Sequence, residues 1–62
     1  MKKNMAAYFA MRVMDKEESD GIETAQAYYI AVFSIPAYQP YQAETDMILM
    51  SEGKDYLIPE ME

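Results

Sequence analysis

Four apolar runs divide the chain, with polar and mostly acidic residues between them. They cover residues 5–14, 25–35, 47–50 and 56–58. With a period of two, the first run places Phe9, Met11 and Val13 on one face. Such alternation, with aromatic and β-branched residues, is typical of half-buried strands. We therefore expect strands near residues 5–14, 26–35, 46–51 and 55–59.

Two glycines mark the expected turns between these strands. Asp20-Gly21 separates the first two runs and Glu52-Gly53 the last two. Gly supplies the positive φ that a tight hairpin loop needs. This predicts a mainly β or small α+β fold, a compact antiparallel sheet of about four strands built from two hairpins, with at most one short helix. Residues 36–46, which contain two prolines, are expected to form an extended loop.

A helix is the alternative for two segments. Met and Ala favour helices, and Phe9 and Val13 lie four residues apart, as on one helix face. Ser19-Asp20 resembles a helix N-cap, which favours a helical turn or two at residues 22–28.

The length of 62 residues predicts a single small domain, residues 1–62, with a marginal core. The core is expected to contain Phe9, Met11, Val13, Ile30, Val32, Leu49 and Leu57. The chain has no Cys, so disulfides and Cys-ligated zinc are excluded. Small cores often need further support, so we expect a homodimer or an obligate partner.

The residue types needed for most catalysis are missing. The chain has no His, the usual general acid or base at neutral pH. Pairing of Ser51 with Lys54 is explained more simply as turn chemistry. The acidic stretch around Gly21 fails as a calcium loop, because Lys16 and Ala27 would occupy positions that require carboxylates. We expect no enzyme activity, no cofactor and no metal site.

Charge is the most informative property of the composition. Eleven acidic residues against five basic ones give a net charge of -6, which disfavours direct binding to nucleic acid or an anionic membrane. It suits a basic protein surface instead. The carboxylates expected to contact a partner crowd two connections: Asp15, Glu17, Glu18, Asp20, Glu23, Glu52 and Asp55. Tyr38 and Tyr41 are expected either to anchor the linker or to add apolar contacts.

Two classes of function fit these features. One is a non-catalytic inhibitor whose carboxylates imitate a row of phosphates and occlude a nucleic-acid-binding protein. Small acidic proteins of phages and mobile elements, including some anti-CRISPR and anti-restriction proteins, act in this way. The likeness is one of size and charge, and no motif matches a particular family. The other class is a homo-oligomeric assembly module whose acids serve only solubility.

The start of the chain bears on location. Lys2 and Lys3 precede an apolar run, as in a signal peptide, but Arg12 and Asp15 follow too soon. No segment approaches the ~20 apolar residues of a membrane span. We therefore expect a cytoplasmic protein.

Overall fold

The computed structural model describes residues 4–60, which form three α-helices and no β-strand. In chain order the elements are α1 (Met5–Asp20), α2 (Ile22–Phe33), the 3-10 helix η1 (Pro36–Tyr41), α3 (Gln42–Ser51) and the 3-10 helix η2 (Asp55–Leu57). The predicted antiparallel sheet is therefore wrong, and the fold is a small all-α one. Lys2 and Lys3, at the start that resembles a signal peptide, lie outside the described residues.

Helix α1 forms because its apolar residues fit the helical period. Ala6, Phe9, Ala10 and Val13 share one buried face, as residues three and four apart do on a helix. Asn4 caps the helix, since its side-chain oxygen accepts from the backbone N–H of Ala7 at 3.2 Å.

Gly21 joins α1 to α2 without any other intervening residue. Its N–H donates to the carbonyl of Glu17, and its own carbonyl accepts from the N–H of Ala25. The chain reverses there because Gly21 adopts φ 97° and ψ 174°, a conformation open almost only to glycine. The predicted turn is thus a helix junction, and the helical alternative for residues 22–28 is confirmed.

The linker is helical rather than extended. Pro36 begins η1, and Pro40 lies inside it. Pro36 is tolerated because the first residues of a helix need no backbone N–H donor, whereas Pro40 removes one donor within the 3-10 turns. In α3, the hydroxyl of buried Thr45 lies 2.8 Å from the carbonyl of Tyr41 and 3.2 Å from that of Ala6, which ties α3 to α1.

Gly53 ends α3 with a pair of backbone hydrogen bonds. Its N–H donates to the carbonyl of Met50, and that of Lys54 donates to the carbonyl of Leu49. With φ 72° at Gly53, this is a Schellman motif. The expected hairpin at Glu52-Gly53 is therefore a helix C-cap followed by η2.

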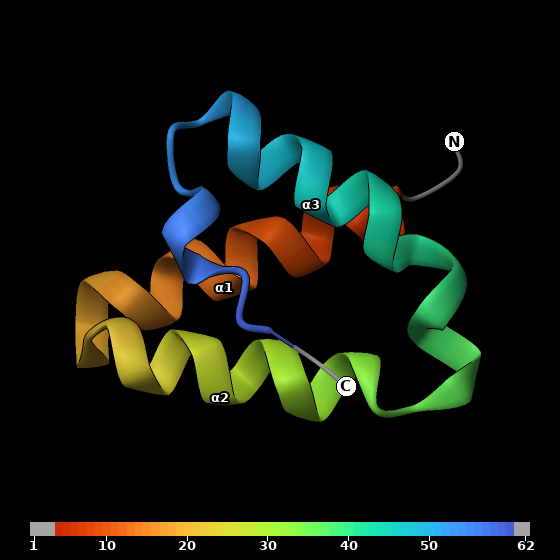
Figure 1. Ribbon diagram of the computed structural model, residues 1–62, viewed down its shortest axis with the longest axis horizontal. Helices are drawn as coiled ribbons and strands as arrows, with labels where there is room; N and C mark the ends of the chain where they lie inside the picture. Colours follow the sequence, from red (N-terminus) through yellow and green to blue (C-terminus); the bar gives the residue numbers. More distant parts are fainter. Residues whose placement is uncertain (1–3, 61–62) are drawn as a thin grey trace.

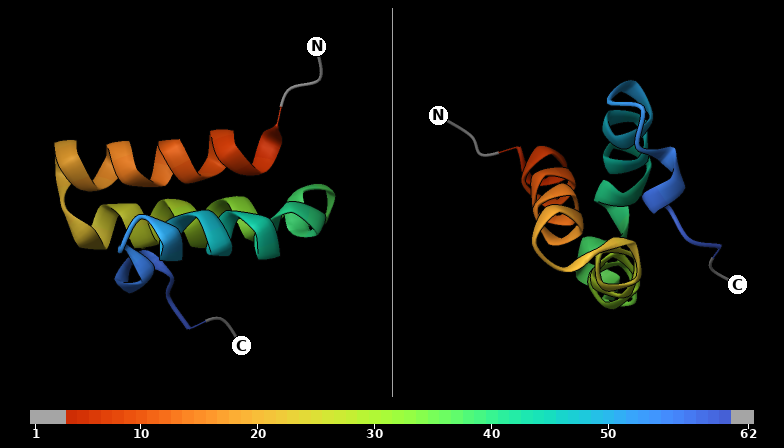
Figure 2. Two further views of the ribbon diagram at one scale, coloured as in Figure 1. Left: turned by 90° about the horizontal axis from the view of Figure 1, so that it is seen from above. Right: turned by 90° about the vertical axis from the view of Figure 1, so that its left-hand side faces the viewer.

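Helices α1 and α3 run in the same direction, and α2 runs back between their ends (Figure 1). The three surround one core, with α2 along one edge of the molecule (Figure 2). The buried hydrophobic residues are Ala6, Phe9, Ala10, Val13, Ala25, Tyr29, Val32, Phe33, Leu49 and Leu57. The core prediction is thus confirmed at five positions and wrong at Met11 and Ile30, which are 60% and 41% exposed. Within residues 4–60, no helix has both the length and the apolar character needed to cross a membrane.

Candidate functional site: an acidic end of the helical bundle

The first acidic connection lies at the α1–α2 junction. Asp15, Glu17, Glu18 and Asp20 occupy the second half of α1, and Glu23 lies in the first turn of α2. All of these except Glu17 are exposed. The junction forms the left end of the molecule in Figure 1.

The second acidic connection reaches the same end. Near the start of α1, the amide of Asn4 donates to Glu44 of α3 at 3.1 Å. Near the end of α1, Glu17 contacts Lys54, which follows α3. The two helices therefore lie side by side along their length, and Lys54, which lies between exposed Glu52 and Asp55, reaches α1 one turn before the junction. We call these seven carboxylates the acidic end: Asp15, Glu17, Glu18, Asp20, Glu23, Glu52 and Asp55.

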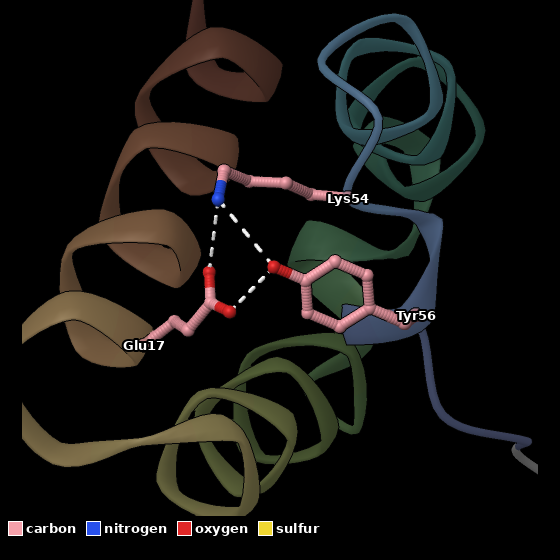
Figure 3. A network of polar contacts seen from close by, with 3 residues as sticks. All are labelled: Glu17, Lys54 and Tyr56. Atoms are coloured by element: carbon pink, nitrogen blue, oxygen red, sulfur yellow. Dashed lines mark hydrogen bonds and ion pairs between the residues drawn. The ribbon is translucent and has the colours of Figure 1, made fainter.

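Glu17 holds the two connections together (Figure 3). Its carboxylate accepts from Lys54 Nζ at 3.1 Å and from the hydroxyl of Tyr56. Lys54 Nζ also lies 3.4 Å from that hydroxyl. The Glu17 side chain is only 19% exposed. It thus stabilises the arrangement of the acidic end, whereas Glu18 and the other five exposed carboxylates remain open to a partner.

This three-residue contact shifts the pKa of each member. The hydrogen bond from Tyr56 lowers the pKa of Glu17, and Lys54 lowers it further. The contact with Glu17 raises the pKa of both Lys54 and Tyr56. Because the pKa of Glu17 is lowered on folding, its contribution to stability is lost as the pH falls through the folded value. Because the pKa values of Lys54 and Tyr56 are raised on folding, the contribution of these two groups to stability is lost as the pH rises through their folded pKa values.

We therefore expect Glu17→Gln to reduce stability most between about pH 5 and pH 10, the range in which all three groups hold their folded charge state. The difference in melting temperature from the natural protein should shrink on both sides of this range. Glu18→Gln removes the same charge one residue away, without these contacts, and serves as the control. An equal pH profile for the two variants would contradict the assignment to Glu17.

Two carboxylates of the acidic end oppose the rules of helix stability, whereas Glu23 in the first turn of α2 follows them. Carbonyl groups at a helix C-terminus carry partial negative charge, so acidic residues there cost about 0.3–1 kcal/mol each. Both α1 and α3 end here, and neither has a basic residue in its last turn. Glu18 and Asp20 lie in that turn of α1. Local departures from stability rules are expected at functional sites.

Basic residues do little to neutralise this end. Lys54 is engaged with Glu17. Arg12 and Lys16 lie over the ring of Tyr28, at 6.0 and 5.9 Å from its centre, a range in which a cation is attracted to the ring face. This contact keeps the two cations beside α2.

The structure does not bring Tyr38 and Tyr41 to the acidic end. Both belong to η1, which lies at the opposite end of the molecule (Figure 1). Tyr38 is half-buried, with its ring 5.1 Å from that of Phe9 and edge-on to it. Tyr41 is 38% exposed and its ring lies 6.3 Å from Phe9. Tyr38 thus anchors the linker to the core, which is one of the two roles expected from the sequence.

Sequence reasoning missed the role of Lys54 and Tyr56 in positioning Glu17. They lie 37 and 39 residues further along the chain, and no local pattern links such distant positions. Within residues 4–60, the acidic residues form no cluster suited to a metal ion, and the surface has no pocket. The acidic end therefore offers a surface for contact rather than a cavity.

Comparisons with known protein families, with curated proteins and with solved structures each found no match.

Proposed function

We propose that this chain is a small non-catalytic binding protein whose acidic end covers a basic surface of a nucleic-acid-binding protein. The observation that supports the proposal is the convergence of two acidic connections, 29 residues apart between Glu23 and Glu52 in the sequence, on one end of the bundle. Without the fold, the second connection would have no reason to lie beside the first.

The charge at this end suits such a partner. Six exposed carboxylates lie on a chain of net charge -6, next to the negative ends of α1 and α3 and the positive start of α2. Complementary charge accelerates association and rejects partners of the wrong sign. A groove lined by Lys and Arg for phosphate binding is the protein surface that best matches a dense row of carboxylates. Such a partner would meet the protein in the cytoplasm.

The small size of the end also restricts how it binds. The molecule measures 31 × 26 × 18 Å along its principal axes, so contact through one end buries less than the ~800 Å² per partner of a standard interface. Binding then depends strongly on electrostatic attraction, and we expect affinity to fall steeply as salt rises.

The test compares two variants with the same net charge. Glu18→Lys reverses one charge at the acidic end. Glu60→Lys reverses one charge away from it, and both variants change the net charge from -6 to -4. Partners are isolated from a lysate of the host at low and high salt, and each is then tested for release of bound labelled DNA or RNA by the natural protein. Glu17 is left unchanged because its reversal would break the contact with Lys54 and Tyr56.

We expect the acidic-end variant to lose at least about tenfold in affinity, or ~1.4 kcal/mol. The control should lose much less. The acidic-end variant should keep or slightly raise the natural melting temperature, because it removes an acidic residue from the last turn of α1. Equal losses would show that only total charge matters. A partner whose affinity ignores both salt and the reversals, or one that keeps its nucleic acid, would overturn the proposal.

A further inference from the structure

The side of the molecule on which α1 and α3 lie next to each other carries apolar side chains outside the core. The left view of Figure 2 looks onto this side, with α2 behind α3. Two contacts define the line of α1 that faces α3. The carbonyl of Ala6 accepts from the hydroxyl of Thr45 at 3.2 Å, and Glu17 contacts Lys54. Met14 lies on this line, because it follows Ala6 by eight residues and precedes Glu17 by three.

Helical spacing places two more apolar residues beside Met14. Met11 follows Asn4 by seven residues, and the amide of Asn4 donates to Glu44 of α3, so Met11 lies two turns further along the same side of α1. On α3, Ile48 follows Glu44 by one turn. Met11 is 60% exposed, whereas Met14 and Ile48 are half-buried against the core. We call these three residues the methionine strip: Met11, Met14 and Ile48.

Exposed carboxylates lie at both ends of the methionine strip. Glu44 is at its start, next to the first turn of α1. At the other end, Glu18 follows Met14 by four residues on α1, and Glu52 follows Ile48 by four residues on α3. Glu18 and Glu52 both belong to the acidic end, so the strip leads directly into that end.

No free cation lies on the strip within residues 4–60, whose basic residues are all engaged elsewhere. Lys54 contacts Glu17 at 3.1 Å. Arg12 and Lys16 lie over the ring of Tyr28 in α2. A molecule that covers the strip therefore meets negative charge at each end and no positive charge to repel its own cations.

We infer that the methionine strip binds an amphipathic helix of the partner, with the apolar face of that helix on the strip and its Lys and Arg residues beside the flanking carboxylates. Charge complementarity selects a basic occupant. Met is adaptable and common at surfaces that receive amphipathic helices. Residues 4–18 of α1 span ~21 Å, the length of about four helical turns. The inference rests on the proposed function for the basic character of the partner, and it adds the shape of the element that binds.

Charge also disfavours two other occupants of the strip. A second copy would bring a chain of net charge -6 against an equal one, and its own carboxylates would meet those at the ends of the strip. An anionic lipid surface would be repelled in the same way. A basic helix is repelled by neither end.

A synthetic peptide tests the surface directly. The probe is a helix of about 14 residues built of leucine and lysine, with every leucine on one face, and a peptide of the same composition with leucines all round the helix is its control. The methionine methyl groups are isotope-labelled for NMR and assigned with single Met→Leu variants. We expect the probe to shift the signals of Met11 and Met14. The signal of Met50, which is 58% exposed, should stay unchanged, because Met50 follows Asp46 by one turn and Asp46 faces Tyr29 of α2.

Met11→Gln and Met50→Gln make the same change at two methionines of nearly equal exposure, 60% and 58%. Met and Gln have similar helix propensities, and neither position is in the core, so both variants should keep the natural melting temperature. We expect Met11→Gln to weaken binding of the probe about fivefold, the effect of losing about half the burial of one Met side chain. Met50→Gln should bind as the natural protein does. Equal effects of the two variants, or equal binding of probe and control peptide, would overturn the inference.

Glu18→Lys separates a failure of this inference from a failure of the proposed function. Both Glu18→Lys and Met11→Gln should weaken binding of the partner isolated from the lysate. A partner weakened by Glu18→Lys and not by Met11→Gln would overturn the inference and keep the acidic end as the binding surface. A partner weakened by both that keeps its nucleic acid would overturn the proposed function alone.

Sedimentation equilibrium tests the remaining occupant. We expect the natural protein to stay at 7.2 kDa in the absence of the probe. A dimer that Met11→Gln disrupts and Met50→Gln does not, in a protein that binds no probe, would identify a second copy as the occupant of the strip and overturn the inference.

Discussion

Phe33→Ala is expected to destabilise the protein by about 3–5 kcal/mol, the largest effect of any single change discussed for this fold. Phe33 is 1% exposed. Its ring lies 5.6 Å from that of Phe9 and 4.8 Å from that of Tyr29, so truncation opens a cavity where α1 and α2 meet. Small domains have a free energy of unfolding near or below the lower end of the usual 5–15 kcal/mol, and the variant should be largely unfolded at 37 °C.

Two further variants keep this expectation testable if Phe33→Ala does not fold. Phe33→Leu removes less volume and should shift the urea midpoint by an amount that remains measurable. Ile30→Ala lies one turn earlier on α2 and is 41% exposed, so it should change stability by well under the cost of a buried truncation. If Ile30→Ala were as damaging as Phe33→Leu, the packing of α2 described above would be wrong.

The contrast between Phe33 and Ile30 also shows why the sequence suggested strands. Phe9 and Val13 are four residues apart, a spacing that places two residues on one face of a strand and of a helix alike. The residues that distinguish the two are Ala10, which is fully buried, and Met11, which is 60% exposed. An interpretation that gives most weight to large side chains places Met11 in the core, whereas the helix buries the smaller Ala10.

Alanine had a further role that the pattern did not reveal. Ala6, Ala10 and Ala25 are 0% exposed because small side chains allow helices to approach closely. Alternation analysis treats Ala as weakly apolar and neutral, so these positions carried little signal. The high helix propensity of Ala and Met was the better guide to both long segments.

The chain reversals were placed correctly, and their type was not. Gly21 and Gly53 both have positive φ, as expected for residues that turn the chain. A glycine of this kind ends a helix as readily as it closes a hairpin, so the sequence alone does not separate the two. In the linker, Pro36 and Pro40 favour an extended conformation of the residue before each of them, although proline also fits the first turn of a helix.

The candidate site likewise has one part that the sequence predicts and another part that depends on the fold. Asp15 to Glu23 lie together because they are adjacent in the sequence, and this part of the site was predictable. The approach of Glu52 and Asp55 depends on the parallel course of α1 and α3 and on the contact of Glu17 with Lys54. Contacts of that kind arise from tertiary packing, which no local pattern encodes.

Gly21→Ala is expected to destabilise the protein by about 1–3 kcal/mol, because φ 97° with ψ 174° is a region that L-residues rarely occupy. A Cβ atom at this position would meet no atom within 4 Å, so the cost comes from the backbone alone. Gly53→Ala, at φ 72°, also has open space around the new Cβ. It should cost about 1–2 kcal/mol, the usual penalty for a left-handed residue. Urea unfolding of the two variants measures both values.

A D-alanine at position 21 distinguishes backbone strain from any other cause. The conformation of Gly21 is the mirror image of an extended one, so it is comfortable for a D-residue. D-Ala also restricts the unfolded chain, and we expect it to stabilise the protein by about 0.4–1 kcal/mol relative to glycine. The chain of 62 residues is short enough for total chemical synthesis with this single replacement. Destabilisation by D-Ala as well as by L-Ala would mean that the α1–α2 junction does not have the geometry described, and the convergence of the acidic end on this junction would then have to be reconsidered.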